Sequence, residues 1–156
     1  MSLRVLTWVH VAISLAGILS GFVVIGGLIQ GNPLEGWTRV FLWTTVLTSV
    51  TGFLFPFERF LPSHLFGVIS LGVLGVVLYA RYGADLAGGW RLGYVLGAIF
   101  AQYLNVFVLV VQMFQKIPVL RPLAPTQKEP PFVIAQLVVL VGFIAFGVLA
   151  AGQFRG

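Results

Sequence analysis

The chain has no cysteine and few charged residues, and both absences narrow its chemistry. Without cysteine it forms no disulfide, thiolate zinc site, iron–sulfur cluster or covalent c-type haem attachment. Charged residues make up only 8% of the 156 residues, far fewer than in a soluble domain. The sequence also lacks P-loop, GxSxG, HExxH and dinucleotide-binding motifs. It therefore predicts no catalytic residue, and whether the protein is an enzyme stays open.

What the chain has in abundance is apolar sequence. Hydrophobic residues make up 59% of it, more than a soluble domain of this length can bury. They form runs of about 20 residues bounded by Gly, Pro, Trp and charged residues. We expect an all-α polytopic membrane protein, a single transmembrane domain over residues 1–156 with five transmembrane helices in one bundle. The predicted spans are residues 5–29, 38–57, 63–82, 90–115 and 132–153.

The net charge of +5 falls in the predicted loops and ends. We therefore expect contact with the anionic headgroups of the lipid bilayer and no nucleic-acid partner. Five spans put the termini on opposite sides, so the basic residues of the two sides can be compared. The amino-terminal side has Arg4, Arg59, Lys116, Arg121 and Lys128, and the other side has Arg39, Arg81, Arg91 and Arg155. By the positive-inside rule, this count favours a cytoplasmic amino end.

Amide side chains interrupt the apolar stretch AQYLNVFVLVVQMFQ at residues 101–115. Gln102, Asn105 and Gln112 lie at i, i+3 and i+10, which puts them on one stripe of a helix. Because an amide in hydrocarbon has no water partner, we expect this stripe to face the other helices.

The depth of the polar residues predicts a layer in one leaflet. Each of the five spans contributes one hydrogen-bonding residue within about two turns of its amino-terminal-side end. These residues are His10, Thr51, His64, Gln112 and Gln136. We expect the layer to lie beneath residues 116–131, KIPVLRPLAPTQKEPP, which contain five of the eight prolines. Because so many prolines prevent a continuous helix, this segment is predicted to be extended and ordered.

The polar layer has the side chains for a ligand-binding or redox module. His10 and His64 are candidate iron ligands of a non-covalent haem b, and Arg59 is one of the cations that would hold its propionates. A quinone or a lipid headgroup would suit the imidazoles and amides equally well. A metal ion outside haem is disfavoured because the layer has no buried carboxylate. The predicted ligand contacts are His10, His64, Asn105, Gln112, Gln136 and Arg59.

A second hypothesis assigns these residues no ligand. Polar side chains in membrane bundles often only hydrogen-bond across helices. The protein would then be a non-catalytic accessory or assembly subunit of a membrane complex, with a complex partner or a second copy docking on residues 116–131.

Three segments carry a resemblance: WTTVLTSVTGFLFPF, YLNVFVLVVQMFQKIP and LAPTQKEPPFVIAQL. Through them the chain resembles, over nearly its whole length, a family of small bacterial inner-membrane proteins of uncharacterised function. The resemblance implies a location in the bacterial inner membrane. It supplies no activity, ligand or functional residue.

Overall fold

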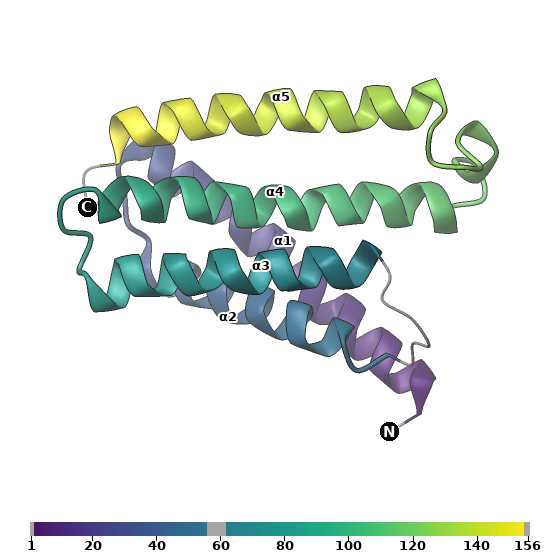
Figure 1. Cartoon of the computed structure of the whole chain (residues 1–156), viewed down its shortest axis with the longest axis horizontal. Coiled ribbons are helices and arrows are strands. Elements are labelled where there is room, and N and C mark those ends of the chain that lie inside the picture. The colour runs from purple at the N-terminus through teal and green to yellow at the C-terminus, as the bar shows by residue number, and fades with distance from the viewer. Residues whose placement is uncertain (1, 56–61, 155–156) are drawn as a thin grey trace.

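The computed structural model describes residues 2–55 and 62–154, which fold into five long helices (Figure 1). They are α1 (Leu3–Gln30), α2 (Glu35–Gly52), α3 (Pro62–Leu78), α4 (Trp90–Lys116) and α5 (Pro130–Gln153). A π-helical turn, Tyr79–Gly83, continues α3, and a short 3-10 helix, Arg121–Leu123, lies between α4 and α5. The described ranges contain no β-strand, so the prediction of an all-α fold is confirmed.

Local sequence sets the ends of α1. The Ser2 side chain caps the first turn, accepting a hydrogen bond from the Val5 N–H at 3.2 Å. At the other end Gly31 adopts a φ of 75°, and its N–H donates to the Leu28 carbonyl. Glycine tolerates this left-handed conformation because it has no Cβ, so the chain can turn sharply into α2.

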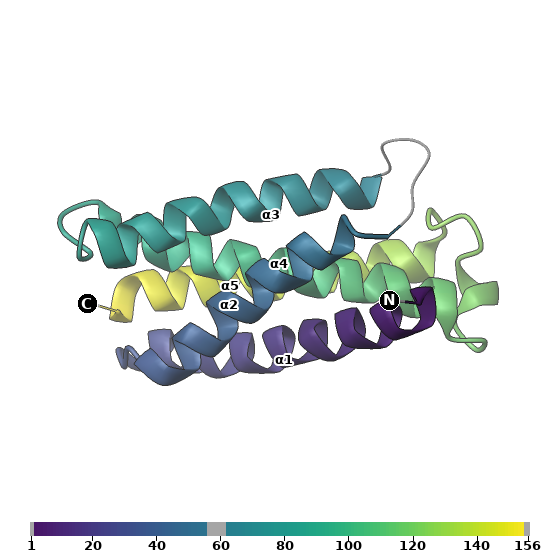
Figure 2. The same cartoon turned by 90° about the horizontal axis from the view of Figure 1, so that it is seen from below.

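The helices alternate in direction and form an up-and-down bundle. In Figure 1, α3, α4 and α5 run alongside one another, while α1 and α2 cross behind them at an angle. Figure 2 shows α1 and α3 at opposite edges of the bundle, and α2 packs against both. The central helix is α4, which packs against α1, α3 and α5.

The two ends of the bundle differ in packing. We call the end with the C-terminus of α1 the arginine end, after Arg81 and Arg91, and the opposite end the histidine end, after His10 and His64. The buried residues of α1 all lie between Gly17 and Leu28. Towards the histidine end the amino end of α1 diverges from α4 (Figure 1), so the helices splay there.

Four helical segments are long and apolar enough to cross a membrane: Leu3–Gln30, His64–Gly83, Trp90–Lys116 and Pro130–Gln153. Helix α2 is not among them. Its 18 residues include Glu35, Arg39 and five threonines, which lower its hydropathy. Several of these hydroxyls bond to the helix's own carbonyls, as Thr48 does to Thr44 at 2.7 Å. The structure thus supports a membrane protein with four such spans, and α2 packs beside α1 in the same bundle.

The proline-rich connection differs from the predicted extended strand. The chain leaves α4 through hydrogen-bonded turns, passes through the 3-10 helix and enters α5 at Pro130. Proline allows this because its fixed φ suits turns and the first position of a helix. The prediction of an extended segment is therefore wrong. The connection is folded against the end of α4.

Candidate functional site

A pair of amides ties the centre of α4 to α1 and α2. Gln102 is fully buried, and its Nε2 donates to the Ile18 carbonyl of α1 at 2.7 Å. The Nδ2 of Asn105 donates to Thr45 Oγ1 of α2 at 3.3 Å and lies 3.4 Å from Gln102 Oε1. A Cβ at Gly21 would collide with the Gln102 amide, so glycine there permits the close approach of α1 and α4.

Gln136 ties α5 to α4 nearer the histidine end. Its Nε2 donates to the Phe107 carbonyl at 3.2 Å. Its Oε1 is buried and accepts no hydrogen bond from residues 2–55 and 62–154. A buried amide oxygen without a donor costs free energy, so this atom retains an unused capacity to accept a hydrogen bond.

Gln112 does not share this environment, because its side chain is exposed. The prediction that it faces the other helices is wrong. It lies close to the stripe of Asn105 and belongs to the last two turns of α4. The amino end of α1 lies away from this end of α4 (Figure 1). Helical periodicity identified the right face of α4, but Gln112 is exposed at the splayed end of the bundle.

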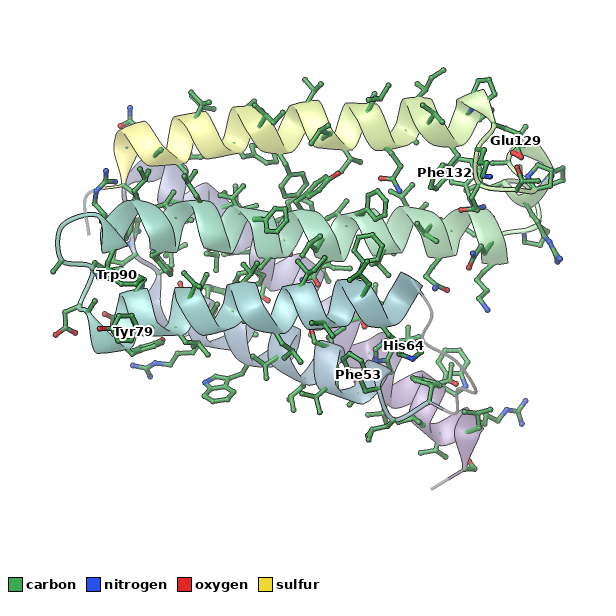
Figure 3. The ribbon with its side chains drawn as sticks, viewed as in Figure 1. Phe53, His64, Tyr79, Trp90, Glu129 and Phe132 are labelled. Atoms are coloured by element: carbon green, nitrogen blue, oxygen red, sulfur yellow. The ribbon has the colours of Figure 1, made fainter. Side chains whose placement is uncertain are left out.

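The two histidines contact the same segment at the end of α2. His10 Nδ1 lies 2.7 Å from Thr51 Oγ1, and its ring meets the Phe55 ring edge-on with centroids 5.4 Å apart. His64 is buried, and its ring lies beside that of Phe53, with centroids 5.6 Å apart (Figure 3). The structure thus brings both histidines to the C-terminal end of α2. They lie on helices that each pack against α2.

The predicted haem site also requires a cation for the propionates and a position for the iron between the two histidines. Arg59 lies outside the described residues. Within the described residues no group of three or more His, Cys, Asp and Glu side chains is placed to hold a metal ion. For haem, the iron would have to lie where both imidazoles reach it from opposite sides. His10 Nδ1 is bonded to Thr51, so its Nε2 would be the nitrogen that binds the iron. The haem ligand pair therefore stays a prediction.

A polar cluster at the arginine end was missed by the sequence analysis. Arg81, in the π-helical turn after α3, is 8% exposed. Its Nη1 donates to the Tyr94 hydroxyl of α4 at 3.2 Å, and its Nη2 lies 3.7 Å from Glu35 Oε1 of α2. The guanidinium also lies over the rings of Tyr82 and Tyr94. Three helices therefore meet at one buried cation.

The sequence contained one signal for this cluster, an arginine within the apolar stretch VVLYARYG. An ionisable residue inside a span usually marks a functional or structural contact. From the sequence, Arg81 was predicted only as one of the basic residues outside the membrane; the π-helical turn that contains it is seen only in the structure.

Comparisons with protein-family models, with curated proteins and with solved structures found no match.

Proposed function

We propose that this chain is a non-catalytic accessory or assembly subunit of a membrane complex. The observation that carries the proposal is that its amide side chains hydrogen-bond to other helices of the chain. Gln102, Asn105 and Gln136 donate hydrogen bonds to neighbouring helices of the same chain. Donors engaged in this way fix the shape of the bundle and are not available to a substrate. The function then belongs to the surfaces that the bundle presents.

One such surface is the connection between α4 and α5, residues 117–129. It is ordered by contacts of its own: Ala124 is fully buried, and the Thr126 N–H donates to the Glu129 carboxylate at 2.7 Å. Its side chains Val119 and Leu123 are nevertheless 77% and 48% exposed. Apolar groups on an ordered segment outside the spans are typical of a protein contact, and preorganisation lowers the entropy lost on binding.

The first turns of α5 extend this surface into the membrane. Ile134, Leu137, Val138 and Val141 lie at i, i+3, i+4 and i+7, each more than half exposed. This spacing makes one apolar stripe beside the connection. We name residues 117–123 together with these four the docking face, and propose a membrane protein as its partner, either another subunit or a second copy.

Cross-linking from single cysteines tests the docking face, since the natural chain has no cysteine. We would compare Val119→Cys with Ala87→Cys, an exposed position at the arginine end, each coupled to a photoactivatable maleimide in native membranes. We expect a discrete adduct only from Val119→Cys, and mass spectrometry of the adduct would identify the partner. Equal adducts from both positions, or none from either, would contradict the proposal.

A second candidate is a module that binds haem b or a quinone. It is favoured by the two histidines at one end of α2 and by the buried Gln136 Oε1, which lacks a donor among the described residues. A Soret band in the purified protein that disappears in both His10→Ala and His64→Ala would support haem. Extraction of a stoichiometric quinone, lost in Gln136→Leu, would support the quinone. Protein free of both would exclude the module.

We also propose that the protein lies in the bacterial inner membrane, that α2 crosses the membrane in addition to the four apolar segments, and that the amino end is in the cytoplasm. The support is the basic residues of the amino-terminal side and the packing of α2 along α1. Leu3→Cys and Gln153→Cys would be labelled with an impermeant maleimide in vesicles of both orientations. Labelling of the two positions on opposite sides, with Leu3→Cys cytoplasmic, is expected. Labelling on one side would contradict five spans.

A further inference from the structure

An apolar groove of about 410 Å³ runs along the contact of α4 and α5. One wall consists of α4 residues between Leu92 and Tyr103, and the other of α5 residues between Leu140 and Ala151. Gly147 lines the groove, and a Cβ there would be in ordinary contact with Leu96 and Ile99 at 3.8 and 3.9 Å. The missing side chain therefore helps to keep the groove open.

The length of the groove matches one leaflet of a bilayer. Leu92 and Tyr103 are eleven positions apart, as are Leu140 and Ala151, which is about 16.5 Å of helix at 1.5 Å per residue. The hydrocarbon core of a bilayer is about 30 Å thick, so half of it is about 15 Å. The groove thus has the length of one extended acyl chain from the headgroup level to the midplane.

A cation lies at the outer end of the groove. Arg91 directly precedes Leu92, and its Nη1 donates to the Ala151 carbonyl at 3.4 Å and to the Phe154 carbonyl. Its Nε and Nη2 donate no hydrogen bond within the described ranges. The guanidinium therefore has donors left for a phosphate, which it can bind through two nitrogens at once.

Aromatic residues at the same end mark the headgroup level. The rings of Tyr79 and Trp90 pack edge-on with centroids 4.8 Å apart (Figure 3), and both are exposed. Tyrosine and tryptophan gather where the membrane meets water.

We propose that the groove between α4 and α5 binds one anionic phospholipid, with an acyl chain along the groove and the phosphate on Arg91. The apolar walls take the chain of any phospholipid. The positive charge at the outer end provides the preference for a headgroup with net negative charge over a zwitterionic one.

Native mass spectrometry of the purified protein would measure this preference. The protein would be exchanged into equal amounts of phosphatidylglycerol and phosphatidylcholine with identical acyl chains. We expect one tightly retained lipid, with phosphatidylglycerol favoured about fivefold, the ratio that one basic residue near a headgroup provides. Arg91→Gln should bring the ratio close to one, while Arg121→Gln, an exposed residue at the opposite end, should leave it unchanged.

Arg91 also holds the last carbonyls of α5, so Arg91→Lys separates charge from helix capping. Because lysine keeps the charge, the preference should survive in this variant. A ratio that is unchanged in Arg91→Gln, or lost equally in Arg91→Lys and Arg91→Gln, would overturn the assignment of the phosphate to Arg91.

The groove itself is tested by filling it. Gly147→Leu should remove the retained lipid of either class, whereas Gly142→Leu should not, because Gly142 lies outside the groove with open space around it. Unchanged lipid retention in Gly147→Leu would overturn the proposal. A lipid-free dimer in the same spectra would also overturn it, since a helix of the second copy would then occupy the groove.

Discussion

The arginine end and the histidine end of the bundle both contain polar and aromatic residues, but the helices converge at the arginine end and diverge at the histidine end. At the arginine end, buried Arg81 joins α2, α3 and α4 through Glu35 and Tyr94. At the histidine end, α1 has no buried residue before Gly17, and Gln112 of α4 is exposed. Polar side chains meet where the helices converge. At the histidine end only part of the predicted layer meets: His10 contacts Thr51, whereas Gln112 is exposed.

The comparison is tested most strongly by removing the buried cation. Arg81→Met removes the hydrogen bond from the guanidinium to the buried Tyr94 hydroxyl and the ion pair with Glu35, and should lower the free energy of unfolding by about 1–3 kcal/mol. Arg39→Met, at an exposed position of α2, should change it by less than about 0.5 kcal/mol. Unfolding by SDS in mixed micelles, followed by circular dichroism, would measure both. Equal losses would show that Arg81 does not hold the three helices together.

The histidine end should respond less. His10→Ala removes the hydrogen bond to Thr51, and bonds of this kind in membrane bundles average about 0.6 kcal/mol. Thr51→Val removes the same bond, so the double variant should lose less than the sum of the two single losses. The same SDS titration would provide all three values. Fully additive losses would mean that the two side chains do not interact.

The exposure of Gln112 predicts a difference in reactivity along α4. A cysteine at Gln112 should react with a maleimide several-fold faster than a cysteine at Asn105, because Asn105 lies against Thr45 of α2. Rates would be measured in detergent micelles, with cysteine at fully buried Gln102 as the slow reference. Similar rates at 105 and 112 would instead support the prediction from periodicity that both positions face the other helices.

The smallest effect concerns the cap of α5 beside the docking face. Hydrogen bonds from the Thr126 side chain and N–H hold the pKa of the Glu129 carboxyl below its usual range. A carboxyl whose pKa is lowered by folding stabilises the folded segment above its unfolded pKa, and that stabilisation is lost as the pH falls through the folded pKa. The NMR shift of the Thr126 amide should therefore titrate below pH 4.5, the ordinary pKa, and Glu129→Gln should abolish this titration.

Much of the fold follows from local properties of the chain. Apolar runs of span length predict helices close to α1, α3, α4 and α5, because a backbone in lipid must satisfy its own hydrogen bonds. The same reasoning predicts that Gln102 and Asn105 face the bundle, and both reach neighbouring helices. Helix α2 was predicted as a helix, yet its threonines and two charges leave its status as a span to experiment.

The sequence by itself determined the all-α class, the approximate positions of the helices, and the face of α4 that carries the amides, since these depend on hydrophobicity and helical period. Only the tertiary structure decided which polar residues meet. Helices α1 and α2 cross the other helices at an angle (Figure 1). Arg81 is buried at one end of the bundle, and Gln112 is exposed towards the other. Such an angle arises from many small packing contacts between residues distant in sequence, as where Gly21 admits Gln102. No local pattern encodes it.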